Sequence, residues 1–197
     1  MITFFRYIKS DLIKIAKPPM LLMHIIAPIL GILLFASGSN ILRAATLVSS
    51  IFPFLTAIIC AIIANKEASA GNFQQMLTSH IKFMPFISKL IIMLLLGFGA
   101  ILIFIFGLGF YHFPFHFIYY LHYACILLVN SIFFYVLNFI ISLRFGSIQT
   151  ITAGIFEIFL NFFLKCTLSA CIVRAGIIIV LAWMWFSKWE GNNCSDK

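Results

Sequence analysis

Two charged side chains inside apolar segments are the residues of this 197-residue chain best suited to chemistry. Glu157 lies in the apolar segment 147–164, and Arg174 lies in the next one, 170–187. A charge inside a membrane is costly unless it is paired, so such residues face the interior of a helix bundle and mark ion pairs, substrate paths or proton relays. We therefore expect Glu157 and Arg174 to form an intramembrane polar pair. This pair either holds two antiparallel segments together or serves a substrate or a proton.

Histidine is the commonest metal ligand, and three histidines lie close together in YHFPFHFIYYLHY. Pro114 breaks the helical register between His112 and His116, and no acidic residue lies near these two or near His122. Aromatic side chains at the end of a membrane span are typical of anchoring at the interface. We therefore expect no metal site here. His24, in an earlier apolar segment, is expected to make a hydrogen bond within the helices.

Motifs for nucleotide binding or hydrolysis are absent from the chain. It contains no GxxxxGK[ST], no HExxH and no GxSxG. Glu157 and the histidines lack the paired groups that an intramembrane enzyme would need. We therefore expect no enzymatic activity and no cofactor bound by this chain, so any ATP would be hydrolysed by a partner subunit.

The composition indicates an integral membrane protein. Hydrophobic residues make up 63% of the chain and charged residues only 9%, whereas soluble domains carry about 25% charged residues. Within the apolar segments, apolar and polar residues do not alternate along the chain, which argues against an outer-membrane barrel. The formal net charge is +8, but the basic residues are scattered and form no stripe, so no nucleic acid is expected as a partner.

Six apolar segments are long enough to be considered as membrane spans, each of which needs about 20 residues. The sixth has the weakest signal, because Arg174 lies in its first third and its clean apolar part is short. We expect an all-α integral membrane protein with one transmembrane domain over residues 1–190 and a polar tail over residues 191–197. The candidate spans are residues 19–37, 44–64, 88–110, 117–141, 147–164 and 170–187.

The distribution of basic residues predicts the orientation. If the N-terminus is inside, ten of the 13 Lys and Arg residues lie in cytoplasmic segments and three lie in outer ones. Cytoplasmic loops carry an excess of Lys and Arg. The chain is therefore expected in the cell membrane, crossing the bilayer several times, with both termini in the cytoplasm.

Two polar segments flank or interrupt the predicted spans. Residues 1–17 place apolar and basic side chains on opposite faces, which favours an amphipathic helix lying on the inner leaflet; the alternative is a basic flank that only anchors the first span. Residues 65–82 carry apolar side chains at three- and four-residue spacing, which predicts a short amphipathic helix that must pack against headgroups or a protein. An ordinary solvated loop is the alternative. The apolar positions are Ala70, Phe73, Met76, Leu77 and Ile81.

The stretches FRYIKSDLIKIAKPPMLLMHIIAPILG and KEASAGNFQQMLTSHIKFMPFISK, residues 5–31 and 66–89, cover about a quarter of the chain. The chain resembles the permease subunits of type-two ABC exporters, and among them the lantibiotic-immunity permeases, in these stretches. The resemblance rests on a Ser-Asp…Lys helix before a span with an internal Pro, and on Glu67, a Gly-x-Phe-Gln run and Lys89 after the second span. The C-terminal third departs from the family pattern, since a basic entrance containing cysteines precedes the last apolar segment.

The resemblance implies that residues 65–82 are the coupling helix, which docks into a cleft of an ABC ATP-binding subunit. It further implies a second permease subunit, identical or related, and export of a membrane-active antimicrobial peptide as lantibiotic or bacteriocin self-immunity. The alternative is a non-transporting membrane immunity or assembly protein that sequesters a peptide and does not need residues 65–82. The residues implied in docking are Glu67, Gly71, Phe73, Gln74, Met76 and Leu77.

Overall fold

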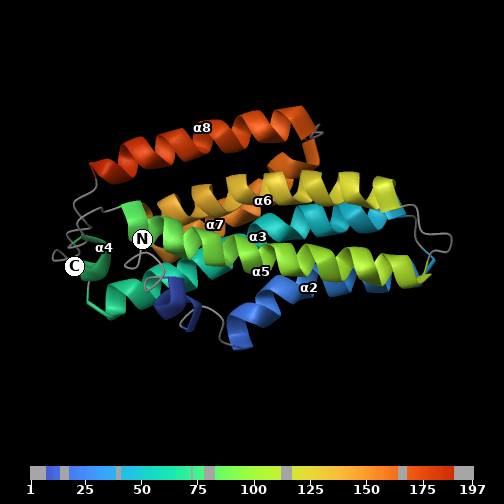
Figure 1. The fold of residues 1–197 in the computed structure, drawn as a ribbon, viewed down its shortest axis with the longest axis horizontal. Coiled ribbons are helices and arrows are strands. Elements are labelled where there is room, and N and C mark those ends of the chain that lie inside the picture. The colour runs from blue at the N-terminus through green and yellow to red at the C-terminus, as the bar shows by residue number, and fades with distance from the viewer. Residues whose placement is uncertain are drawn as a thin grey trace.

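The structure, a computed structural model, describes residues 8–13, 18–38, 41–71, 73–77, 83–111, 117–163 and 168–188. These residues form helices and contain no strand, which confirms the expected all-α fold. The long helices run alternately in opposite directions along the bundle (Figure 1). They are α2 (Pro18–Ala36), α3 (Ile41–Ser69), α5 (Phe83–Tyr111), α6 (Phe117–Phe145), α7 (Ser147–Phe163) and α8 (Leu168–Ser187), and the one-turn α4 (Gln74–Leu77) lies between α3 and α5.

Four helices in the described part of the chain are long and apolar enough to cross a membrane. Helix α8, which contains the sixth and least certain of the spans expected from the sequence, is one of them. Its mean hydropathy is high despite the single charge of Arg174. The described apolar parts of α2 and α7, Met20–Ala36 and Ser147–Phe159, are shorter. The four candidate spans are Arg43–Ser69, Met84–Phe110, Leu121–Phe145 and Ser169–Ser187.

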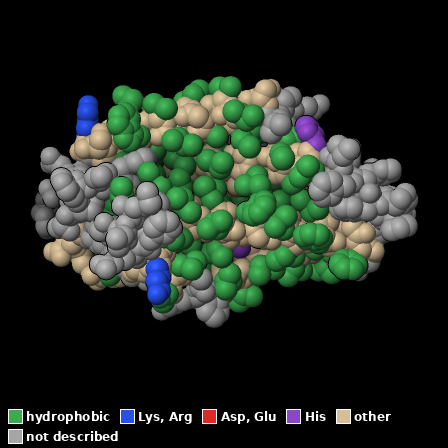
Figure 2. All heavy atoms as spheres, viewed as in Figure 1, with side chains coloured by type: hydrophobic (Ala, Val, Ile, Leu, Met, Phe, Trp, Pro, Cys, Tyr) green, Lys and Arg blue, Asp and Glu red, His purple; other side chains and the backbone are tan. Residues whose placement is uncertain are grey.

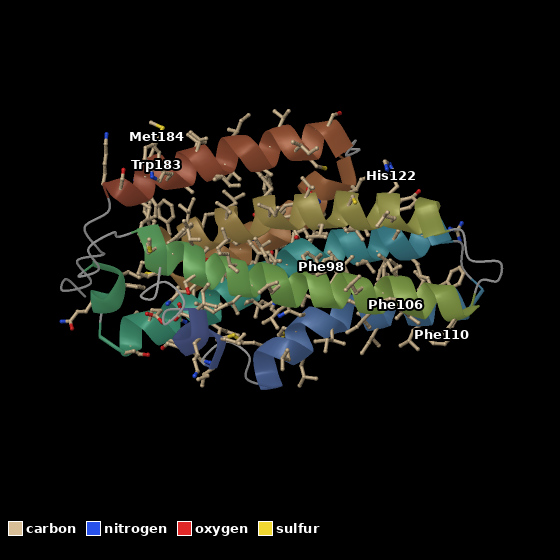
Figure 3. The ribbon with its side chains drawn as sticks, in the orientation of Figure 1. Phe98, Phe106, Phe110, His122, Trp183 and Met184 are labelled. Carbon is tan, nitrogen blue, oxygen red and sulfur yellow. The ribbon has the colours of Figure 1, made fainter. Side chains whose placement is uncertain are left out.

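The exterior of the bundle is apolar. Large hydrophobic side chains are exposed along several helices, among them Phe110, which is 90% exposed, and Ile148, which is 75% exposed. Figure 2 shows hydrophobic side chains over most of one face, and Figure 3 shows Phe98, Phe106 and Phe110 along the outside of the bundle. Soluble monomers rarely expose apolar patches of more than a few hundred Å². The four long apolar helices and this exterior are those of a membrane-embedded protein.

The centre of the bundle is formed by α3 and α6. Helix α3 packs against α2, α6 and α7, whereas α8 packs mainly against α6. Helices α3 and α7 approach closely at Gly154, where an added Cβ would overlap the Cβ of Ala57 and would lie 3.4 Å from the Cα of Phe54. Small residues allow such backbone approach between membrane helices. Gly154 therefore determines how near α7 lies to the centre.

The polar segment after α3 does not form the single amphipathic helix predicted over residues 65–82. Helix α3 continues to Ser69, the chain then turns, and only the single turn α4 follows. Gly71 and Phe73 have φ angles of 147° and 64°, which a right-handed helix cannot contain. The backbone N–H of Phe73 instead donates to the carbonyl of Glu67 at 3.3 Å. That prediction is therefore wrong for the described part of the segment, and residues 78–82 lie outside it.

The N-terminal segment is helical at residues 8–13. The remainder of the predicted amphipathic helix over residues 1–17 lies outside the described residues, as does the tail at residues 191–197.

Candidate functional site

Four side chains form a buried polar group at one end of the bundle, which we call the buried junction: Asp11, Glu67, Ser88 and Lys89. The Lys89 Nζ lies 2.8 Å from the Asp11 Oδ1 and 3.3 Å from the Glu67 Oε1. The Ser88 hydroxyl donates to the Asp11 Oδ2 at 2.8 Å. The Lys89 and Asp11 side chains are each 1% exposed and that of Glu67 is 9% exposed, so these charges are almost fully removed from solvent.

The buried junction connects three parts of the chain through side-chain contacts. Asp11 belongs to the N-terminal helical segment, Glu67 to the last turns of α3, and Ser88 and Lys89 to the first turns of α5. A buried ion pair is favourable only with good geometry and with additional hydrogen bonds to the charged groups. Both carboxylate oxygens of Asp11 have such a partner. The junction therefore fixes the N-terminal segment against the region where the chain leaves α3 and enters α5.

The N-terminal segment exposes apolar as well as polar side chains: Lys9 and Ser10 are exposed, and so are Leu12 and Ile13. Asp11 is fully buried, whereas its neighbours Leu12 and Ile13 are 43% and 67% exposed. In water this arrangement would be unfavourable, since apolar side chains are exposed and a carboxylate is removed from solvent. At the boundary of a bilayer it is favourable, because apolar side chains enter the acyl region.

The residues predicted to dock an ATPase differ strongly in exposure. Glu67 lies in the buried junction, while Phe73 and Met76 belong to the hydrophobic core of this chain. Gln74 is exposed and Gly71 is partly exposed, and the side chain of Leu77 lies outside the described residues. The docking role stays a prediction. If it is right, the contact surface includes Gln74 and the exposed side chains of the preceding turn, Lys66, Ser69 and Ala70.

A second polar group, which we call the polar centre, lies inside the bundle: Thr56 of α3, Asn138 of α6 and Glu157 of α7. The Asn138 Nδ2 donates to the Glu157 Oε2 at 2.8 Å and to the Thr56 Oγ1 at 3.3 Å. All three residues are at most 3% exposed. The Glu157 Oε1 and the Asn138 Oδ1 have no hydrogen-bond partner among the residues that the structure describes. Because Gly154 precedes Glu157 by one turn on the same helix, the close packing of α7 on α3 brings the carboxylate to this position.

The structure brings Asn138, and not Arg174, to Glu157. Arg174 lies half-buried on α8, and α8 packs on α6. One oxygen of Glu157 accepts from Asn138, and the other has no hydrogen-bond partner in the described part of the chain. Sequence reasoning missed Asn138. Asn138 and Ser142 are polar side chains one helical turn apart within an apolar span, and this pattern could have indicated a buried polar contact on α6.

The described histidines do not form a metal site. His24 Nδ1 donates to the backbone carbonyl of Met20 at 2.7 Å, which confirms the expected hydrogen bond, and its ring stacks on Tyr135 at 6.0 Å. His122 is exposed near the start of α6 (Figure 3). His112 and His116 lie outside the described residues. Within the described part of the chain, no group of three or more His, Cys, Asp or Glu residues could hold a metal ion.

Comparison of the chain with known protein families, curated proteins and solved structures gives no match.

Proposed function

We propose that this chain is the six-span permease subunit of an ABC transporter that exports a membrane-active antimicrobial peptide and so protects the cell from it. A separate ABC ATP-binding subunit would hydrolyse ATP, and a second permease subunit, identical or related, would complete the pore. The protein would lie in the cell membrane with both termini in the cytoplasm. The buried junction and α4 would then face the cytoplasm.

The observation that supports this proposal is the contact between the two stretches that carry the family resemblance. Asp11 belongs to the first stretch, Glu67 and Lys89 belong to the second, and the three charges meet in the buried junction. A force applied to the segment after α3 would therefore reach both the N-terminal segment and the start of α5. Such a connection would allow an ATPase bound at this segment to move the packed elements together, because packed cores shift between discrete arrangements and do not deform continuously.

A second function is favoured by the burial of Phe73 and Met76. These two side chains are only 5% and 0% exposed, so they already pack in the chain's own core. A protein that sequesters an antimicrobial peptide in the membrane would need no ATPase, and its polar segment would only have to close the end of the bundle.

Copurification from the native host distinguishes the two functions. Phe73→Asp is unsuitable as a test, because it would disrupt the core whether or not a partner docks. Gln74→Trp adds bulk at an exposed position of α4, and Ser37→Trp adds the same side chain at an exposed position at the opposite end of the bundle. We expect a stoichiometric ATP-binding subunit, identified by mass spectrometry, with the wild type and with Ser37→Trp. Gln74→Trp is expected to lose it.

The opposite result would contradict the transporter proposal. If no ATP-binding subunit accompanies the folded wild-type protein, or if Gln74→Trp retains it as fully as Ser37→Trp does, the segment is not the docking surface. Absence of the subunit together with direct binding of an antimicrobial peptide would establish the sequestering function instead.

A further inference from the structure

We propose that the polar centre binds a monovalent metal cation of the sodium type, held by the Glu157 Oε1 and the Asn138 Oδ1. This inference does not rest on the proposed transport function. It rests on the hydrogen-bond arrangement of three side chains from α3, α6 and α7.

The orientation of the Asn138 amide follows from its neighbours. The hydroxyl of Thr56 donates to the carbonyl of Pro53 at 2.6 Å, so the Thr56 Oγ1 is left as an acceptor. The Asn138 Nδ2 donates both to this oxygen and to the Glu157 Oε2. The reversed amide would place its oxygen against these two acceptors, which is unfavourable. The Asn138 Oδ1 is therefore a fixed acceptor.

Two acceptor oxygens on neighbouring helices consequently have no donor. Within the part of the chain that the structure describes, the Asn138 Oδ1 and the Glu157 Oε1 are both buried without a hydrogen-bond partner. Among the residues that the structure describes, no basic side chain forms an ion pair with Glu157. An ionised carboxylate is strongly unfavourable in the membrane interior unless a cation or a proton neutralises it. A bound cation satisfies both oxygens and neutralises the charge, and without the cation the carboxyl group takes up a proton.

The chemistry of the two ligands selects the kind of cation. Carboxylate and amide oxygens are ligands of hard cations, whereas soft metals prefer thiolates. The polar centre supplies a single carboxylate, so a monovalent cation gives a neutral site. A divalent cation would leave a net positive charge in a region of low dielectric constant, which is costly.

Direct binding tests the proposal. Full-length protein in lipid nanodiscs is titrated with radioactive sodium at constant ionic strength, with N-methylglucamine as the balancing cation. We expect one saturable site per chain in the wild type and its loss in Glu157→Gln. Thr152→Val, which changes an exposed residue of the same helix, is the matched control and is expected to keep the site. Wild-type protein without saturable sodium binding, or Glu157→Gln that retains it, would overturn the proposal.

A second measurement uses only the wild type, so it decides the matter even if Glu157→Gln does not fold. Dicyclohexylcarbodiimide, which modifies carboxyl groups in apolar surroundings, is applied with sodium or with N-methylglucamine, and mass spectrometry locates the product. At a sodium concentration of about 100 times the Kd, modification of Glu157 is expected to slow about 100-fold, because only the unoccupied site reacts. Modification of Glu157 at the same rate in the two media would mean that a cation does not occupy Glu157.

Discussion

Lys89→Met is expected to lower the free energy of unfolding by about 3–5 kcal/mol, because it leaves the two buried carboxylates of Asp11 and Glu67 without their shared cation. The substitution keeps most of the side-chain volume, so the loss reports the charge and not a cavity. Titration of the micelle-bound protein with sodium dodecyl sulfate, followed by helical circular dichroism, measures it.

Two variants make this prediction specific. Lys66→Met removes an exposed charge from the last turn of α3 and is expected to change the free energy of unfolding by no more than about 0.5 kcal/mol. Combining Lys89→Met with Asp11→Asn and Glu67→Gln removes all three charges and is expected to recover part of the loss, since no uncompensated charge remains buried. If Lys89→Met and Lys66→Met have the same effect, the buried junction does not hold the three segments together.

Gly154→Ala is the second substitution with a large expected effect. The new Cβ would overlap the Cβ of Ala57 on α3, and the nearby Cα of Phe54 belongs to the backbone and cannot move by a change of rotamer. Overpacking of this kind costs about 1–3 kcal/mol. The same detergent titration measures the loss. Sodium binding is expected to weaken as well, because α7 would move Glu157 away from Asn138.

The contact partner supplies the control. Ala57→Gly removes the atom that the new Cβ would meet, so the double variant is expected to be more stable than the sum of the single effects predicts, by about 0.5–3 kcal/mol. Gly176→Ala on α8 adds a methyl group that meets no described residue of a neighbouring helix within 4 Å and should have little effect. Equal costs for Gly154→Ala and Gly176→Ala would show that the α3–α7 approach is not tight at this position.

The candidate sites were only partly predictable. Glu67, Lys89 and Glu157 were recognisable from the sequence, because a charge beside or within an apolar segment is rare and must be accommodated. The partners of these charges could not be recognised from the sequence, because they lie far away along the chain. Lys89 pairs with Asp11, 78 residues earlier, and Asn138 pairs with Thr56, 82 residues earlier. The expected pairing of Glu157 with Arg174 assumed that consecutive helices pack together, whereas α8 packs on α6 and Glu157 meets Asn138.

The sequence by itself determined the class of protein and the approximate positions of the helices. Hydropathy summed over about 20 residues depends only on local composition, and a chain in lipid must satisfy its backbone hydrogen bonds within helices. Only the tertiary structure decided which face of each helix is buried. In a soluble helix an apolar stripe marks the inner face, but here the exposed Phe106 and the buried Phe104 of α5 are chemically identical. Because lipid and protein interior are both apolar, the partners of the few polar side chains emerged only once the helices were packed.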